Sequence, residues 1–259
     1  MKHQAIIDYI VAWLSDYSEK SSTKGFVVGV SGGIDSALTS TLCALTKKDV
    51  LVVNIPILQQ SAQHKRAKEH IAWLEDNFKN VHSAEVDLTE AFKGISKDLP
   101  KEIQDDLTMA NLRSRMRMLT LYAFAGNKKL LVAGTGNKIE DFGVGFFTKY
   151  GDGGVDVSPI ADLTKTEVFA LAKHLNVVES IQTAKPTDGL WDDDRSDEDQ
   201  IGATYPELEW AMDYVSKNLQ HNLTERQKEV LNIYIHLNKI NQHKMQPIPV
   251  CKIDEALKQ

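Results

Sequence analysis

The sequence contains little of what marks secreted, membrane-spanning or nucleic-acid-binding proteins. Cysteine occurs only at positions 43 and 251, which argues against a disulfide framework or a zinc site and fits a cytoplasmic location. No apolar run approaches the ~20 residues that span a bilayer, and Asp8 interrupts the apolar start, so we expect no membrane segment and no signal peptide. Thirty basic residues against 36 acidic ones give a net charge of −6, which argues against a nucleic-acid partner.

What is present is an alternation of short apolar strands and amphipathic helices, in a chain of ordinary globular composition that is long enough for one large domain or two small ones. Strands alternating with helices predict an α/β fold with a parallel sheet and right-handed crossovers. Ligands of such sheets bind at the carboxyl ends of the strands. We predict strands at 26–30, 50–55, 81–86 and 129–133, and helices at 3–19, 34–45, 61–77, 111–125, 163–175, 207–219 and 224–240.

The most informative segment is Ser-Gly-Gly-Ile-Asp-Ser at 31–36, between the first predicted strand and its helix. Its paired glycines allow a tight turn, and the turn presents backbone N–H groups and a helix N-terminus to a phosphate. It is not a Walker A loop, because the Gly-Lys-Ser/Thr ending is absent. The segment instead resembles the pyrophosphate loop of the ATP pyrophosphatases, which cleave ATP to AMP and pyrophosphate while adenylating a substrate. Asp35 places a carboxylate, a ligand that Mg²⁺ prefers, beside the expected phosphates.

Two further segments at the predicted rim extend this interpretation. Gly-Thr-Gly-Asn-Lys-Ile-Glu at 134–140 follows a strand and offers Glu140 as a second carboxylate for Mg²⁺. Phe-Phe-Thr-Lys-Tyr-Gly-Asp-Gly-Gly at 146–154 combines aromatics, a lysine and glycines, which suits a planar heteroaromatic ligand. A glycine-rich hairpin with core aromatics is the structural alternative for this segment.

Together these segments resemble the NAD synthetases, and the resemblance reaches from the N-terminal helix to His243-Lys244. It implies one domain over 1–259 with a Rossmann-like three-layer α/β/α fold, similar to that of the adenine nucleotide alpha-hydrolases. It also implies ATP-dependent amidation of deamido-NAD⁺ by ammonia, through an adenylated nicotinate, to give NAD⁺, AMP and pyrophosphate. Glutamine-dependent relatives carry an added amidotransferase domain. Since the synthetase pattern begins within the first thirty residues, we expect free ammonia as the donor, unless a separate glutaminase chain supplies it.

The resemblance also assigns roles to individual residues, with Asp35 and Lys165 as the catalytic pair and Mg²⁺ held by Asp35 and Glu140. The segment from Glu140 to Phe146 is one residue longer than the commonest family spacing, so Asp141 stays open as the second metal ligand, with Glu140 preferred. The implied ATP site comprises Gly29, Val30, Ser31, Gly32, Gly33, Ile34, Asp35, Ser36, Thr135, Lys165 and Thr187, and the implied deamido-NAD⁺ site comprises Arg115, Lys149, Asp156, His243 and Lys244.

The resemblance further implies a homodimer whose interface completes the dinucleotide site. Large apolar side chains on helices 3–19 and 111–125 exceed what one packed face requires, namely Trp13, Tyr17, Met116, Met118 and Tyr122. Residues 188–204 begin with a run of acids, most simply a solvated loop, which the family analogy makes a mobile flap over the nucleotide.

Two other functions stay open at this level. A GMP-synthetase-like or tRNA-thiolating ligase would share the pyrophosphate loop, but the thiolating enzymes are expected to carry cysteine pairs and a basic face, which this sequence lacks. A regulatory nucleotide-binding module without turnover would also share it. The presence of Asp35, Glu140 and Lys165 argues against that module.

Overall fold

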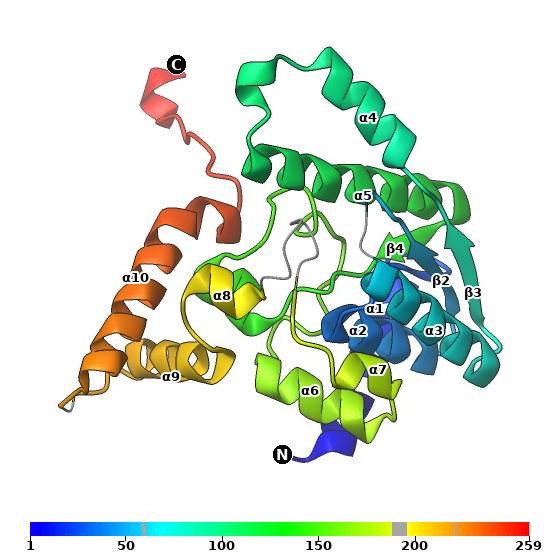
Figure 1. Cartoon of the computed structure of the whole chain (residues 1–259), viewed down its shortest axis with the longest axis horizontal. Coiled ribbons are helices and arrows are strands. Elements are labelled where there is room, and N and C mark those ends of the chain that lie inside the picture. The colour runs from blue at the N-terminus through cyan, green and yellow to red at the C-terminus, as the bar shows by residue number, and fades with distance from the viewer. Residues whose placement is uncertain (59–60, 188–195, 221, 259) are drawn as a thin grey trace.

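The computed structural model describes residues 1–58, 61–187, 196–220 and 222–258 (Figure 1). The helices are α1 (His3–Lys20), α2 (Ile34–Leu45), α3 (Ser61–Asn77), α4 (Thr89–Asp98), α5 (Asp106–Lys128), α6 (Lys165–His174), α7 (Glu179–Gln182), α8 (Asp197–Ile201), α9 (Tyr205–Ser216) and α10 (Glu225–Met245). The strands are β1 (Gly25–Gly29), β2 (Asp49–Asn54), β3 (Val81–Glu85) and β4 (Leu130–Val132). Shorter helical segments are η1 (Lys101–Ile103), the π-helical η2 (Lys138–Val144) and η3 (Glu255–Leu257).

In the described part of the chain, the strands form one parallel sheet in the order β3-β2-β1-β4. Gly25 pairs with Asp49 on one side and with Leu130 on the other, which places β1 between β2 and β4. The strand order therefore reverses between β1 and β4, and the carboxyl ends of these two strands form the crevice in which parallel sheets bind ligands. All four predicted strands are confirmed.

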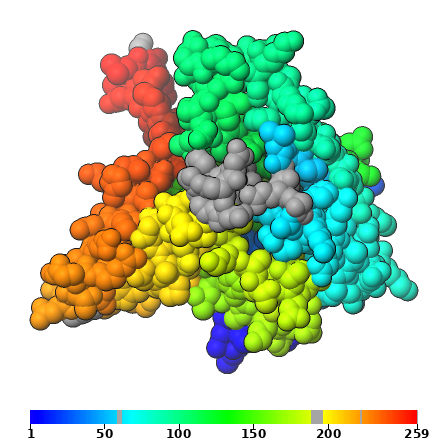
Figure 2. Space-filling model, viewed as in Figure 1, coloured from blue at the N-terminus to red at the C-terminus, as the bar shows by residue number. Residues whose placement is uncertain are grey.

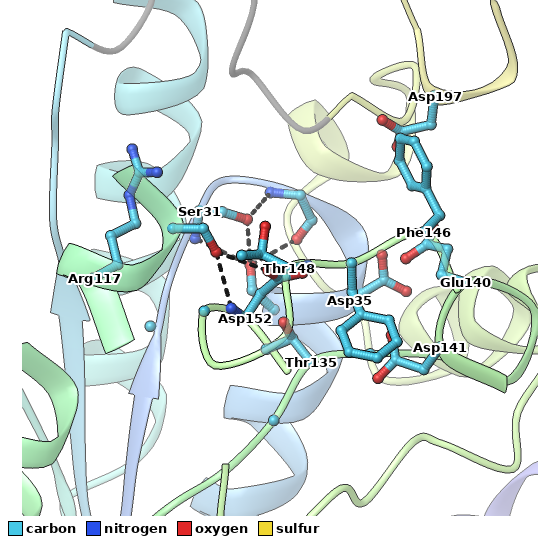
Figure 3. Close-up of a pocket in the computed structure, with 18 of the residues that line it drawn as sticks. Ser31, Asp35, Arg117, Thr135, Glu140, Asp141, Phe146, Thr148, Asp152 and Asp197 are labelled. Carbon is cyan, nitrogen blue, oxygen red and sulfur yellow. Dashed lines mark hydrogen bonds between the residues drawn. The ribbon is translucent and has the colours of Figure 1, made fainter. Parts of the chain in front are cut away.

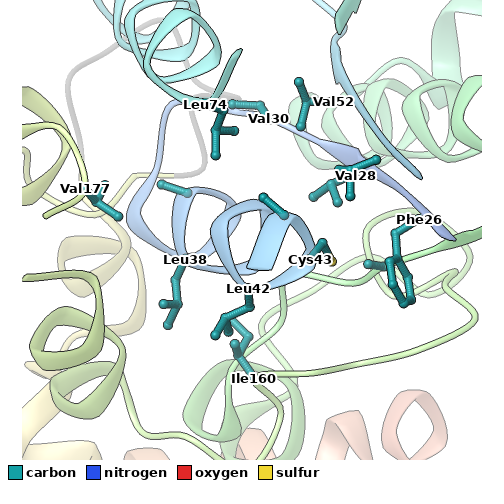
Figure 4. Packing of buried hydrophobic residues seen from close by; sticks show 14 of the residues in the cluster. Phe26, Val28, Val30, Leu38, Leu42, Cys43, Val52, Leu74, Ile160 and Val177 are labelled. Carbon is teal, nitrogen blue, oxygen red and sulfur yellow. The ribbon is translucent and has the colours of Figure 1, made fainter. Parts of the chain in front are cut away.

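The sheet is covered by helices on both faces, which confirms the predicted three-layer α/β/α architecture (Figures 1 and 4). Phe26 and Val28 of β1 point to one face and pack in a cluster with residues of α1, α2, α3 and α6. Val27, between them, points to the other face and packs with Ala125 of α5. Period-two alternation in a strand that is buried throughout is what a doubly covered sheet requires.

A second apolar cluster joins η2, α9 and α10 beside the sheet domain. Capping boxes close the first turns of α6, at Thr164–Glu167, and of α10, at Thr224–Gln227. The helix predicted at 111–125 is longer, because Asp105 caps its start by accepting a hydrogen bond from the Thr108 backbone. Helix α4 was not predicted from the sequence, because Phe92 is its only buried residue and leaves no periodic apolar pattern.

Of the segment predicted to be a mobile acidic loop (188–204), residues 188–195 lie outside the described residues. Residues 196–204 include α8, whose first turn is closed by a capping box between Ser196 and Asp199. Among the helices of the described residues, none is both long and apolar enough to cross a membrane.

We expect Gly32→Ala to destabilise the fold, because Gly32 has φ +86° and a Cβ there would lie 2.4 Å from the carbonyl oxygen of Gln63. A left-handed backbone together with a backbone clash should cost about 2 kcal/mol or more. Gly94→Ala is the matched control: Gly94 lies within α4 with nothing near its Cβ position, so it should stabilise by roughly 0.5–1 kcal/mol. Urea unfolding measures both changes, and equal effects would contradict the role given to Gly32.

Candidate active site

A cavity of about 610 Å³ opens at the carboxyl ends of β1 and β4. Its lining comes from the segments after these two strands, from α5, from the turn at 146–155 and from the end of α10. Figure 3 shows side chains from several of these segments, including Ser31, Asp35, Glu140 and Asp152, gathered around one space. The cavity therefore lies where the strand order predicts a ligand.

The loop after β1 is stabilised by hydrogen bonds between its own hydroxyl groups and its backbone. The backbone N–H of Gly33 donates to Ser31 Oγ at 3.2 Å, and the backbone N–H of Ser31 donates to Ser36 Oγ at 3.2 Å. Ser36 Oγ in turn donates to the Gly33 carbonyl at 3.0 Å. The loop leads directly into α2, so its N–H groups and the positive end of that helix lie together at the cavity. This arrangement favours a phosphate.

Lys165 joins the two carboxylates that the sequence analysis singled out. Its Nζ donates to Asp35 Oδ2 at 2.6 Å and to Glu140 Oε1 at 2.9 Å. The Lys165 side chain is only 3% exposed, while the two carboxyl groups remain partly open to the cavity. One ammonium against two carboxylates leaves this group of three residues with a net negative charge.

The two carboxyl groups differ in their support. Burial raises the pKa of Asp35, because it outweighs the opposing effect of the Lys165 ammonium. Burial also acts to raise the pKa of Glu140, but Lys165 and a hydrogen bond from the Tyr205 hydroxyl outweigh it and lower that pKa. Burial alone would lower the pKa of Lys165, whereas its two carboxylate partners raise it well above the ordinary value.

Asn137 fixes the relative position of the two acids. Its Oδ1 accepts hydrogen bonds from the backbone N–H groups of Ile139 and Glu140 and so caps η2. Its Nδ2 donates to Asp35 Oδ1 at 3.2 Å. Asn137 is fully buried, so the cap also aligns Glu140 with the helix start that carries Asp35.

Asp141 lies in the same cavity but does not share Lys165. Its carboxylate lies against the backbone of Gly136, where an added Cβ would be 1.8 Å from Asp141 Oδ2. Burial, followed by the nearby charge of Asp152, raises the pKa of Asp141 well above its usual range. The geometry thus pairs Glu140, rather than Asp141, with Asp35. Most of the segment from Glu140 to Phe146 belongs to the π-helix η2, which accommodates more residues per turn than an α-helix.

The segment at 146–154 lines the cavity as a turn, not as the hairpin considered as its structural alternative. Thr148 donates through its backbone N–H to Asp152 Oδ1 at 2.9 Å. The Ser114 hydroxyl donates to the same oxygen at 2.7 Å and accepts from the Asp152 backbone N–H. Gly151 allows this contact with α5, because a Cβ there would lie 2.3 Å from Ser114 Oγ.

Four of the five residues assigned to deamido-NAD⁺ line the cavity, namely Arg115, Lys149, His243 and Lys244. The Lys149 ammonium donates to the carbonyl of His243, and Lys244 Nζ donates to the carbonyl of Phe147 at 2.8 Å. These two bonds join the turn at 146–154 to the end of α10. Burial lowers the pKa of Lys244.

Asp156 is the fifth, and the structure places it apart from the cavity lining. Its carboxylate accepts hydrogen bonds from the Tyr122 hydroxyl at 2.9 Å and from the Val132 backbone at 2.8 Å. It thereby ties α5 to the end of β4. Its role toward a substrate stays a prediction.

The remaining ATP-site residues of the sequence analysis lie at the cavity, including Thr135 and Thr187. The Thr187 carbonyl accepts a hydrogen bond from the Gln63 side chain at 3.2 Å. Of the three closely spaced arginines on α5, Arg115 and Arg117 line the cavity, whereas the guanidinium of Arg113 lies 5.7 Å from the centre of the Phe92 ring. Residues two apart on a helix do not share a face, so the three cannot all point inward.

Sequence reasoning missed several polar residues of this site. Asn137 had a local signal, because it immediately precedes a helix as a capping residue. Tyr205, which donates to Glu140 from α9, had none, because 65 residues separate the two in sequence. Ser114 and Asp152 likewise meet only after α5 packs against the turn.

A family model for NAD synthase matches residues 6–248. The chain belongs to the NAD synthase family. Among its relatives, the NH(3)-dependent NAD(+) synthetase of Mycoplasma genitalium is 38% identical, with 85% of this chain and 86% of that protein covered.

Solved structures of the NAD synthases and related enzymes show the same architecture. NMN synthetase from Francisella tularensis superposes with a TM-score of 0.86 at 29% identity, covering 98% of this chain and 100% of that one. NH3-dependent NAD synthetase from Campylobacter jejuni superposes with a TM-score of 0.80 at 25% identity, covering 97% and 100%. These superpositions confirm the Rossmann-like α/β fold over nearly the whole chain.

We expect Lys165→Met to destabilise the protein by ~3–5 kcal/mol, since it leaves two partly buried carboxylates without a counter-charge. Their pKa values should then rise above the unfolded values. The penalty should be largest near neutral pH and shrink as the pH falls toward the ordinary carboxyl pKa of about 4. Urea unfolding at several pH values measures this. As a control, Lys138→Met removes an exposed pair with Asp162 and should cost at most ~1 kcal/mol. A loss that does not depend on pH would contradict the charge argument.

Proposed function

We propose that the protein amidates deamido-NAD⁺ with ammonia at this cavity, using ATP and releasing AMP and pyrophosphate. The observation that carries the proposal is the joining of the Ser31–Ser36 loop to the Asp35–Lys165–Glu140 group in one cavity. An anion-binding loop beside a pair of carboxylates suits a nucleoside triphosphate together with a divalent cation. Membership of the NAD synthase family supplies the reaction class.

We further propose that Asp35 and Glu140 hold Mg²⁺. Carboxylate oxygens are its preferred protein ligands, and Mg²⁺ bound with nucleotides typically takes one or two carboxylates, the remaining ligands being phosphates and waters. The donor set fits this pattern, because the carboxylates of Asp35 and Glu140 meet at one point and line the cavity beside the Ser31–Ser36 loop. Bound there, Mg²⁺ would neutralise charge on the phosphates as the pyrophosphate leaves.

The protein groups mainly position the reactants. A nicotinate carboxylate oxygen attacks the α-phosphorus of ATP, the bond to pyrophosphate breaks, and the resulting acyl-adenylate has AMP as a good leaving group. The N–H groups of the Ser31–Ser36 loop donate hydrogen bonds to the phosphate oxygens, and Lys165 keeps Asp35 and Glu140 at their spacing. Ammonia then attacks the acyl carbon, AMP departs, and the nitrogen loses a proton.

We assign the nicotinate end of the substrate to the turn at 146–154 and the end of α10. Phe147 lies under the Lys244 ammonium, 5.1 Å from ring centre to nitrogen, and both line the cavity. Arg115, exposed on α5 at the same cavity, is suited to a phosphate of the dinucleotide. Ammonia is the donor in the name of the Mycoplasma genitalium relative, an NH(3)-dependent NAD(+) synthetase.

The decisive experiment is mass spectrometry of the products formed from ATP, Mg²⁺, ammonium and deamido-NAD⁺. NAD⁺, AMP and pyrophosphate should appear together, and the rate should rise with pH as the NH₃ fraction increases. Glutamine should not replace ammonium in purified protein. Nicotinate mononucleotide should be tested as a second ammonia acceptor in the same assay, because NMN synthetase from Francisella tularensis superposes with a TM-score of 0.86. Pyrophosphate release without amide formation would contradict the proposal.

Asp35→Asn should retain the fold and lose most amidation activity, because it removes one proposed Mg²⁺ ligand. The expected loss is ~3 kcal/mol or more of transition-state stabilisation, about a hundredfold in kcat/KM. The control is Asp162→Asn, at an exposed position near the start of α6, which should leave kcat/KM unchanged. Thermal unfolding checks that both variants fold. Turnover of Asp35→Asn at the wild-type rate would refute the assignment.

We propose that the protein acts in the cytoplasm. We also propose that two copies form a homodimer through α1 and α5. Trp13 and Tyr17 on α1 and Tyr122 on α5 are exposed, as the sequence analysis anticipated. Two of its candidates are not available for this interface, because Met116 is buried against Ile57 and Phe92 and Met118 lines the cavity.

Leu119 is a better probe of this interface, because it is 67% exposed on α5 and does not line the cavity. Leu119→Glu should lower the molecular mass by light scattering to that of one chain and reduce activity with it. Val215→Glu, an exposed substitution on α9, should change neither. A monomeric wild-type protein that is fully active would overturn the dimer proposal and leave the ATP site unaffected.

A further inference from the structure

Helix α3 lies directly against the phosphate loop and brings an arginine to it. The backbone of Gly32 approaches α3 so closely that an added Cβ would lie 2.4 Å from the Gln63 carbonyl and 3.1 Å from the Ala67 nitrogen. Arg66, on the same turn of α3, donates from Nε to the Gly32 carbonyl at 3.3 Å. It lines the same cavity as Ser31 and Ser36. The side chain is thus placed at the loop by a contact between two backbones.

The guanidinium of Arg66 retains most of its donors. Its bond to Gly32 uses one of five N–H groups, and within the described residues it forms no ion pair with a carboxylate. Arg226 shows the contrast, because it pairs with both Glu207 and Glu229 on the surface. Arg66 is half-buried, and a half-buried arginine that lies against this loop and has no carboxylate partner among the described residues suits a polyanion.

The strand order says which part of ATP reaches Arg66. Helix α3 follows β2, on one side of β1, whereas Glu140 and the turn at 146–154 follow β4, on the other side. The α-phosphorus must face the nicotinate carboxylate, which we place on the β4 side. The β- and γ-phosphates then extend across the loop toward α3.

We propose that Arg66 binds the β- and γ-phosphates of ATP, and hence the departing pyrophosphate, as a phosphate-binding residue that the sequence motifs do not include. This inference rests on the proposed function, since it requires ATP in the cavity. Its charge stabilises the leaving group on the side opposite Asp35 and Glu140. The alternative is that Arg66 only tethers α3 to the loop through Gly32.

The test is isothermal titration calorimetry of ATP, pyrophosphate and AMP, with Mg²⁺, on wild type, Arg66→Gln and Arg66→Lys. Arg66→Gln should weaken the binding of ATP and of pyrophosphate about tenfold to a hundredfold, because charged hydrogen bonds are lost. The affinity for AMP should stay within about twofold of wild type. Arg66→Lys keeps the positive charge but not the paired N–H donors of the guanidinium, so it should lose less affinity for ATP and pyrophosphate than Arg66→Gln. Lys65→Gln removes a neighbouring exposed charge from α3 and should change none of the three.

If Arg66→Gln weakens the binding of AMP and of ATP equally, Arg66 only tethers α3 to the loop and the proposal is overturned. Unchanged binding of ATP and pyrophosphate would also overturn it. If Arg66→Gln fails to fold by thermal unfolding, Arg66→Lys decides through the same comparison of ATP with AMP. Binding is measured without turnover. A wild-type protein that binds ATP but forms no NAD⁺ would therefore refute the proposed function and leave the Arg66 result interpretable.

Discussion

The ammonium of Lys165 between Asp35 and Glu140 is the interaction on which the architecture of the site depends. It joins the start of α2, the π-helical segment η2 and the start of α6, which are up to 130 residues apart in sequence. Tyr205 extends the network to α9 through its bond to Glu140. Buried charges are tolerated only when they are paired and hydrogen-bonded, so this group constrains four segments at once.

The sheet provides the rigid support for that network. Because β1 and β4 are neighbours and parallel, their following loops must emerge side by side, and Asp35 and Glu140 meet there. The apolar cluster under α2, which includes Leu38 and Leu42, holds the start of that helix in place (Figure 4). The same packing excludes water beneath the loop, which strengthens the charge interactions above it.

The helices beside the sheet form the far wall of the cavity. The cluster of η2, α9 and α10 positions His243 and Lys244 against the turn at 146–154, while the C-terminal end of the chain lies at the edge of the molecule (Figure 2). The segment η2 belongs to both parts, because its Ile139 and Val144 pack in this cluster and its Glu140 binds Lys165.

The sequence by itself determined the central strands, because segments such as Phe26–Val28 are apolar on both faces. It also determined the turn at 31–36, because paired glycines and hydroxyls act locally. It also determined both capping boxes, at Thr164 and Thr224. Only the tertiary structure decided that Glu140 rather than Asp141 shares Lys165 with Asp35 and that Tyr205 donates to Glu140. It also decided that Arg66 lines the cavity and that Asp156 does not. These outcomes depend on crossovers and helix packing, where a side chain's partners lie tens of residues away and leave no periodic or spacing signal.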